Sequence, residues 1–389
     1  MPKTNGHIHT PYSFSAFQSV AQAVDLARRE GLKALGINDF YSTAGFDEFA
    51  RLTREARIQP LFNMEFITLS EEGRKAGILY NDPKNPGRIY ACGKGLRRPF
   101  RLSPANEALL ERAMEASQEQ SRKMIEKVDG LLAAMGAPFA LDFQAVRRDL
   151  AKDLVRERHI ARAIRVEAMK RWSAAADLAA FFKALYSGKE SKADFTAAAA
   201  EGASGPATAA LENEIRNQVL KAGGRGYVEE DNASFLRTEQ AFALVRDAGG
   251  IPCYPVLLDD EKGGMTGFEG DWPALARSLR AMGVGMVELI TNRNAQPKAL
   301  EFCRFCRREG FPVLLGTEHN APDMIPLTPQ CRGGAALGEE LTEIGWRAAC
   351  VVAAHQERTA RGGKGFTGPE SRDALEAEGA KVIEAAGRG

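Results

Sequence analysis

The sequence predicts an α/β protein built on a parallel sheet or barrel, and three observations support this fold class. Short apolar segments of strand length alternate with amphipathic helical segments over the first ninety residues, and the alternation resumes near residue 238. The stretch between these regions is rich in Ala, Glu, Lys and Arg and has few strand-like runs. The 389 residues suffice for one large domain, or for one core with a substantial insertion.

In the first ninety residues, the spacing of apolar residues distinguishes predicted helices from predicted strands. Apolar residues three or four positions apart indicate helices over 17–29 and 46–56, and continuous apolar runs indicate buried strands over 32–38 and 60–69. An earlier short strand is expected around His7. The segment 85–95 is hairpin-like, and its Gly93-Lys94-Gly95 could cradle an anion. Because it lacks a nucleotide-binding pattern, we expect a plain turn.

The middle of the chain predicts helices over 109–135, 142–172 and 175–186, with a flexible joint at 197–206. Further helices are expected over 238–248, 272–282 and 297–309, and strands over 251–254, 286–290 and 312–315. We therefore expect a barrel core of residues 1–102 and 225–330 with a helical insertion of residues 103–224. Residues 331–389 are expected to form a helical tail that packs on the core.

Composition and charge exclude several classes of protein. A hydrophobic fraction of 44% with 26% charged residues is ordinary for a globular protein, and the net charge of +1 gives no reason to expect nucleic acid or an acidic membrane as a partner. The first residues, 1–4, lack the apolar region of a signal peptide and no later run approaches 18 apolar residues, so we expect a cytoplasmic protein without a membrane span. Cys303 and Cys306 lie on a helical segment, where a buried apolar face is expected.

The pair His7 and His9 is the most informative feature of the sequence. The chain has only five histidines, and side chains at positions i and i+2 of a strand point the same way. Imidazole is a common ligand of Zn, Fe, Ni and Cu. The pair therefore predicts a metal site, with two solvated histidines in an N-terminal loop as the alternative.

Further polar residues lie at the ends of the predicted strands, where α/β barrels place their ligand sites. They are Asn38, Asp39, Asn63, Glu65, Glu288, Glu318 and His319. Histidines together with carboxylates are a typical composition for a metal site. Each carboxylate also has a structural interpretation, because Asp39 could cap a helix, Glu65 could pair with an arginine and Glu318 could be solvated.

These motifs together resemble the PHP (polymerase and histidinol phosphatase) superfamily, especially its phosphoesterase branch with a helical insertion. Six segments match family motifs in the family's order. They are 5–13 (NGHIHTPYS), 37–40 (INDF), 63–65 (NME), 158–161 (RHIA), 248–255 (AGGIPCYP) and 316–320 (GTEHN). The resemblance implies a distorted (β/α)7-type barrel with a mostly helical insertion, and a metal-dependent phosphoesterase ancestry.

The sequence departs from the family pattern at several ligand positions. Phe14, Phe40 and Tyr254 stand where relatives carry metal ligands, so we expect an apolar wall there. His319 lies one place away from the register of the family's closing histidine. The aligned metal ligands that remain are His7, His9, Glu65 and Glu318. This set implies one or two divalent metal ions, of Zn, Mn or Fe, rather than the three-metal cluster of the family.

The resemblance leads to a metal-dependent hydrolase, in which a metal-activated water attacks a small phosphorylated substrate. Asp39 or His319 could move protons. Arg158 and His159, on an arginine-rich helical segment, could bind the phosphate, although a solvated basic helix is the alternative. Two other functions stay open: a PHP-like binding or regulatory protein that has lost hydrolysis, and a lyase or isomerase with a rebuilt metal site. The oligomeric state is left open.

Overall fold

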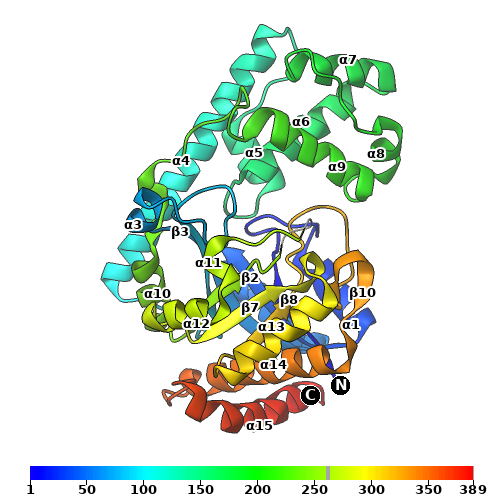
Figure 1. The fold of residues 1–389 in the computed structure, drawn as a ribbon. Helices are drawn as coiled ribbons and strands as arrows, with labels where there is room; N and C mark the ends of the chain where they lie inside the picture. The colour runs from blue at the N-terminus through cyan, green and yellow to red at the C-terminus, as the bar shows by residue number, and fades with distance from the viewer. Residues whose placement is uncertain (260–262, 389) are drawn as a thin grey trace.

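Seven strands form a curled sheet in the computed structural model, which describes residues 1–259 and 263–388. In spatial order they are β1 (Lys3–Ile8), β2 (Leu32–Phe40), β3 (Gln59–Leu69), β4 (Arg88–Lys94), β6 (Ile251–Val256), β7 (Met286–Ile290) and β8 (Val313–Gly316). The edges β1 and β8 meet, because Ile8 bridges Glu318 and the His9 amide donates to the Glu318 carbonyl at 2.7 Å. The expected barrel is confirmed (Figure 1).

Strand β4 is the main departure from the expected fold. It pairs antiparallel with both β3 and β6, whereas the other neighbouring pairs of the barrel are parallel. The prediction of a plain turn over 85–95 is wrong, since Arg88–Lys94 is a strand whose last four residues are buried. Pairing with β3, which sets Cys92 opposite Glu65, overrides the low strand propensity of Gly93. A short strand, β5 (Leu236–Arg237), also pairs with β3.

Helices cover the outside of the barrel. They are α1 (Val20–Glu30), α2 (Phe46–Glu55), α3 (Glu71–Lys75), α10 (Thr238–Asp247), α11 (Gly267–Gly270), α12 (Trp272–Ala281) and α13 (Gln296–Arg308). Helix α1 begins later than expected because the Ser19 side chain caps it by accepting from the Gln22 amide, and it ends at Gly31 with a φ of 77°. Cys303 and Cys306 are buried on α13, which confirms that prediction.

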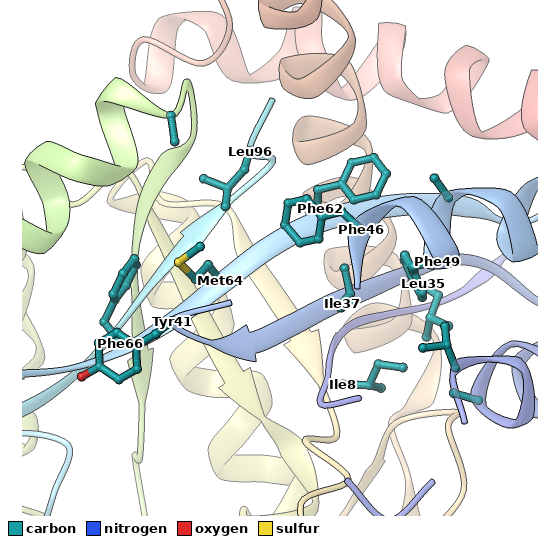
Figure 2. Close-up of a cluster of buried hydrophobic side chains, with 14 of the residues drawn as sticks. Ile8, Leu35, Ile37, Tyr41, Phe46, Phe49, Phe62, Met64, Phe66 and Leu96 are labelled. Atoms are coloured by element: carbon teal, nitrogen blue, oxygen red, sulfur yellow. The ribbon is translucent and has the colours of Figure 1, made fainter. Parts of the chain in front are cut away.

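The core under α1 and α2 shows how the apolar pattern of the sequence is used (Figure 2). Strand residues that face outward from β1, β2 and β3 pack against the apolar faces of these two helices. The labelled members are Ile8, Leu35, Ile37, Tyr41, Phe46, Phe49, Phe62, Met64, Phe66 and Leu96. This packing fixes the first three strands, and with them the residues at their carboxyl ends.

Two helices lie at the opposite end of the barrel from the lobe of helices seen at the top of Figure 1. They are α14 (Gly338–Ala360) and α15 (Pro369–Ala386). Ala34, Leu61 and Leu314, from the first halves of their strands, share a buried cluster with α14, so this helix closes the amino-terminal end of the barrel. Gly379 of α15 lies against the Cys350 carbonyl, where a Cβ would stand 1.8 Å from the oxygen.

The helical lobe lies between residues 104 and 220. Its helices are α4 (Pro104–Ala134), α5 (Phe143–Leu150), α6 (Glu157–Arg171), α7 (Ala175–Leu185), α8 (Phe195–Glu201), α9 (Pro206–Ile215) and the π-helical turn η1 (Arg216–Leu220). Leu110 of α4 belongs to the barrel cluster, whereas Val128 of the same helix belongs to a separate cluster inside the lobe. The domain limits 102/103 and 224/225 stay predictions.

Two expectations for this lobe are wrong. A single helix over 142–172 is replaced by α5 and α6, because the amides of Lys152 and Leu154 donate to the carbonyls of Pro11 and Tyr12 in the loop after β1. The expected flexible joint is instead the end of α8, from which Glu201 accepts hydrogen bonds from the first amides of α9. The lobe is therefore bonded directly to the loop that follows His9.

Shorter elements complete the chain. They are the 3-10 turns η2 (Asn232–Ser234), η3 (Thr291–Arg293) and η4 (Arg332–Gly334) and the strands β9 (Gln330–Cys331) and β10 (Ala335–Ala336), which form a separate antiparallel pair. Among the described residues, no helix has the length and apolar character needed to cross a membrane.

Candidate metal centre

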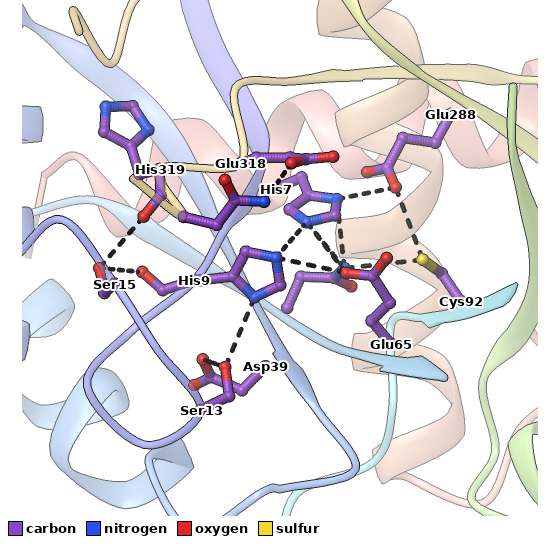
Figure 3. A network of polar contacts seen from close by, with 12 residues as sticks. His7, His9, Ser13, Ser15, Asp39, Glu65, Cys92, Glu288, Glu318 and His319 are labelled. Carbon is purple, nitrogen blue, oxygen red and sulfur yellow. Dashed lines mark hydrogen bonds and ion pairs between the residues drawn. The ribbon is translucent and has the colours of Figure 1, made fainter. Parts of the chain in front are cut away.

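Three side chains meet at the carboxyl ends of β1 and β3. The Nε2 atoms of His7 and His9 lie 3.4 Å apart, and each lies 3.4 Å from Oε2 of Glu65. Figure 3 shows the three groups facing one another. A tetrahedral ion with bonds of about 2.1 Å has ligand atoms about 3.4 Å apart, so the donors present fit one divalent cation.

Close backbone packing sets up this arrangement. Gly316 of β8 lies beside His7, where an added Cβ would stand 2.4 Å from the His7 Cβ, so glycine alone allows β8 to lie this close to β1. The amides of Thr317 and Glu318 donate to the His7 carbonyl. The side chains of His7, His9 and Glu65 are at most 5% exposed, so the three donor groups are buried.

A second layer of polar groups orients His7. Its Nδ1 lies 2.9 Å from Oε2 of Glu288, a carboxylate–imidazole contact of the kind that fixes metal-ligating histidines. The other Glu288 oxygen accepts from Nζ of Lys94 at 2.6 Å, and the same ammonium donates to Oδ1 of Asn38 at 3.0 Å. Cys92 Sγ lies 3.6 Å from Glu288.

The two histidines differ in their protonation. Burial by itself lowers the pKa of His7, but the charge of Glu288 and hydrogen bonds to Glu288 and Glu65 outweigh it and raise that pKa to about 9. Burial and the nearby charges of His7 and Arg158 hold the pKa of His9 well below its usual value. Because a ligand imidazole must be neutral, cation uptake would displace the proton of His7.

Two phenylalanines connect the centre to helix α6. The Phe40 ring stacks on His9 with centroids 5.0 Å apart, and the Arg156 guanidinium lies 4.7 Å from the centre of the same ring. The guanidinium of Arg162 lies 4.3 Å from the centre of the Phe14 ring, and that of Arg158 lies 5.8 Å from it. The wall that these rings form is therefore covered by arginines, which bind aromatic faces through cation–π contacts.

Comparison with known proteins identifies the domain. A family model described as the PHP domain matches residues 5–126. Over these residues the chain is similar to a PHP domain. The match includes His7, His9, Glu65 and Lys94 and stops before Glu288, so it confirms the resemblance to the PHP superfamily for the first part of the barrel. No curated protein gives a significant match to the chain.

Two solved structures share the fold over most of the chain. One is a Bifidobacterium adolescentis protein assigned as a metal-dependent phosphoesterase. It is 15% identical in sequence and has a TM-score of 0.55, and the match covers 88% of this chain and 95% of that chain. The other is an amidohydrolase from Chromobacterium violaceum with bound sulfate and no metal, with 17% identity, 88% and 96% coverage, and a TM-score of 0.54. Together with the PHP domain, they support a metal-dependent hydrolase in general.

The expectation that Tyr254 stands at a ligand position of the PHP site is wrong. Tyr254 pairs with Val287 across β6 and β7, and side chains of paired residues point to the same face. Glu288 points into the barrel, so its neighbour Val287 and hence Tyr254 point outward. The Tyr254 ring is fully buried and packs near Phe268 under the outer helices. Cys253, the residue before Tyr254 on β6, points into the barrel, because successive residues of a strand face opposite sides of the sheet.

Glu318 lies beside the three-ligand cluster without joining it. Its carboxylate accepts from Nη2 of Arg293 at 2.6 Å and from the Asn320 amide. Its φ is 66°, a left-handed conformation that is uncommon for glutamate and directs the side chain away from the strand direction. Glu318, Arg293 and Asn320 line a cavity of about 170 Å³ at the mouth of the barrel. Its role as a fourth metal ligand stays a prediction.

The two residues predicted to move protons are engaged in structural contacts. Asp39 accepts from the Thr10 amide at 2.7 Å and from Ser13 Oγ at 2.6 Å, and burial raises its pKa to about 6 despite these bonds. His319 contacts the Ile325 carbonyl through Nε2 at 2.7 Å. Its Nδ1 lies 2.8 Å from Oγ1 of Thr317, and in Figure 3 its ring points away from the three ligands. Burial lowers the pKa of His319 to about 4.

The residues predicted to bind phosphate separate into two roles. His159 is buried, and its Nδ1 accepts from the Arg156 amide at 3.0 Å, which caps α6. Arg158 points to the barrel mouth, where its Nη2 donates to Oδ1 of Asn320 at 3.3 Å. Arg158 thus reaches the site, whereas the His159 ring supports the helix and packs edge-on against Phe14.

Sequence reasoning missed Lys94 and Cys92, since both lie in the segment expected to be a turn. The usable signal was the alternation in Ile89-Tyr90-Ala91-Cys92-Gly93-Lys94, in which every second side chain faces one side of a strand. Glu288 stood out as a polar residue at a strand end, but its contact with His7 depends on pairing across the barrel.

Proposed function

We propose that the protein is a metal-dependent hydrolase of a small phosphorylated substrate, with one divalent ion held by His7, His9 and Glu65. The observation behind this proposal is the triangle of donor atoms with sides of 3.4 Å, oriented by Glu288. When bound, such an ion acts as a Lewis acid and lowers the pKa of a water molecule in its coordination shell. Two nitrogens and one carboxylate oxygen suit Zn, or Mn or Fe with further water ligands.

Arg158 is the proposed phosphate-binding residue. Its hydrogen-bond partners are the amides of Asn213 and Asn320, and within residues 1–259 and 263–388 no carboxylate lies within 4.0 Å of its guanidinium. Burial, with the nearby charge of Arg216, lowers its pKa to about 10, so the group remains charged at neutral pH. A guanidinium without a carboxylate partner can bind phosphate oxygens through two parallel hydrogen bonds.

Asp39 is proposed to position His9. Its carboxylate holds the Thr10 amide and Ser13 Oγ, and Ser13 Oγ lies 3.5 Å from Nδ1 of His9. The loop after β1 is thereby held in place, and with it the ring nitrogen that faces Glu65. This arrangement favours an indirect role for Asp39 over direct proton transfer to substrate.

The experiment is to remove metal with a chelator, reload the protein with Zn, Mn or Fe, and assay a panel of phosphomonoesters and phosphodiesters. We expect hydrolysis that depends on the added metal and is lost in His9→Asn. His355→Gln, a buried histidine that contacts Gly249 outside the site, is the matched control and should retain activity. Metal binding without hydrolysis of any ester would favour the binding or regulatory alternative, and absence of metal binding would refute the proposal.

A further inference from the structure

The ammonium of Lys94 has the surroundings of a bound cation. The side chain is completely buried, on the barrel-facing side of β4. Its Nζ donates to Oε1 of Glu288 at 2.6 Å and to Oδ1 of Asn38 at 3.0 Å. A carboxylate and an amide oxygen at the carboxyl ends of parallel strands are ligands that a metal ion would also use.

A second set of potential metal donors surrounds this ammonium. Ligand atoms of His7, Cys92 and Glu288 lie within 4.8 Å of one another, and all three residues are buried. Imidazole, thiolate and carboxylate together form a donor set suited to zinc. The set shares His7 with the first centre, and its Glu288 contacts Lys94.

We propose that Lys94 is a built-in cation that occupies the place of a second metal ion and so limits the centre to one ion. The proposal rests on the metal centre of the proposed function. Lys94 donates a hydrogen bond to one oxygen of Glu288, and the other oxygen of Glu288 contacts Nδ1 of His7. Each oxygen of Glu288 therefore already has a partner, and an ion bound there would have to share these oxygens with Lys94 and His7.

The balance of charge also disfavours a second ion. The buried carboxylates Glu65 and Glu288 supply two negative charges. With Lys94 and one divalent ion, the positive charge exceeds theirs by one unit. A second divalent ion would raise the excess to two units, even with the negative charge of a Cys92 thiolate included. Because charges interact strongly at short range in a buried site, the second ion is strongly disfavoured while the ammonium is present.

The test is a titration of the metal-free protein with Cd²⁺, which reports cysteine ligation through its ultraviolet thiolate charge-transfer band. We expect the wild type to bind one equivalent without this band. Lys94→Ala removes the charge and leaves space for an ion, so it should bind one equivalent more than the wild type and show the band. Cys92→Ala in the Lys94→Ala background should lose the band. Lys94→Met, which removes the charge but fills the space, should bind no extra ion.

Several results would overturn the proposal. One is a thiolate band or a second equivalent of Cd²⁺ in the wild type, and another is a folded Lys94→Ala protein that binds no more than the wild type. If Lys94→Ala unfolds, added Cd²⁺ should restore its circular dichroism, and failure to do so also counts against the proposal. The readout is the difference in binding between variant and wild type, so it is independent of whether the wild type hydrolyses any phosphoester.

Discussion

The phenyl ring of Phe40 stacks on the imidazole of His9, with the ring planes inclined by 9°. Arg156 lies over the same phenyl ring, so an arginine of the helical lobe and a ligand of the barrel meet on one side chain. We expected a metal ligand of the superfamily pattern at this position, and here Phe40 stacks on a proposed ligand, His9. The replacement removes a donor atom and adds a contact that orients His9 and places a positive charge at the barrel mouth.

Replacing Phe40 with leucine should weaken metal binding about fivefold, because a stacked aromatic pair contributes about 1 kcal/mol beyond its buried area. Isothermal titration of the metal-free protein with Zn²⁺ measures this change. Phe49→Leu is the matched control, since Phe49 is buried in the same hydrophobic cluster but contacts Phe62 and not His9. Equal Zn²⁺ affinity in Phe40→Leu and wild type would show that the stack does not orient His9.

Replacing Glu288 with glutamine should lower metal affinity by about 10- to 100-fold, the usual effect of removing a partner that orients a ligand histidine. The same change leaves the buried ammonium of Lys94 without a counter-charge and should lower the free energy of unfolding by about 3–5 kcal/mol. Adding Lys94→Met to this variant should recover stability but not the contact with His7. Denaturant unfolding measures the loss of stability, and Zn²⁺ titration measures the loss of metal affinity. Wild-type metal affinity in Glu288→Gln would contradict the proposal that Glu288 orients His7.

Replacing Arg158 with alanine should raise KM for a phosphorylated substrate, and the inhibition constant for inorganic phosphate, by about tenfold or more. The reason is that a charge-assisted hydrogen bond contributes about 1.5–3 kcal/mol. Metal stoichiometry should not change, since the guanidinium is not a ligand. Arg148→Ala removes an exposed arginine that pairs with Asp149 and should have no effect. An unchanged KM in Arg158→Ala would place the phosphate elsewhere.

His355 should make the protein less stable in acid. Its Nε2 lies 2.7 Å from the Gly249 carbonyl and its Nδ1 accepts from the Phe366 amide, so the folded state holds the neutral ring. Burial lowers its pKa to about 4, against about 6.5 in the unfolded chain. The unfolded state thus binds more protons between these values, and the free energy of unfolding falls as pH drops from about 6.5 to 4, by about 3 kcal/mol in total.

Glutamine offers one donor and one acceptor at the same place but does not titrate. The difference in unfolding free energy between wild type and His355→Gln should therefore change by about 3 kcal/mol over that pH range, while contributions from all other groups cancel. Urea unfolding at several pH values measures it. If the free energy of unfolding changed with pH in the same way in the two proteins, His355 would not be the neutral, buried ring that we assign.

The extent to which sequence predicted the fold differs between elements. The strand over 286–290 was predicted with the correct boundaries, and the helix over 46–56 was predicted with the correct start and an end one residue too late, because hydrophobic periodicity is a local property. Strand β4 was missed, because its stability comes from pairing with β3 and β6 and not from its own composition. The helix expected over 142–172 is broken by hydrogen bonds to the loop after His9, and such a distant partner cannot be read from local pattern.

The sequence by itself indicated the donor types of the candidate metal site, since side chains two positions apart along a strand face one way and His9 directly follows β1. Only the tertiary structure decided which groups surround them. Lys94 and Glu288 are 194 residues apart in the chain, and their contact depends on how β4 and β7 are set in the barrel. The outward direction of Tyr254 likewise depends on its pairing with Val287, since a shift of one residue in the pairing would turn its side chain to the other face of the sheet. Side-chain type is encoded locally, whereas partner and direction come from strand pairing between distant segments.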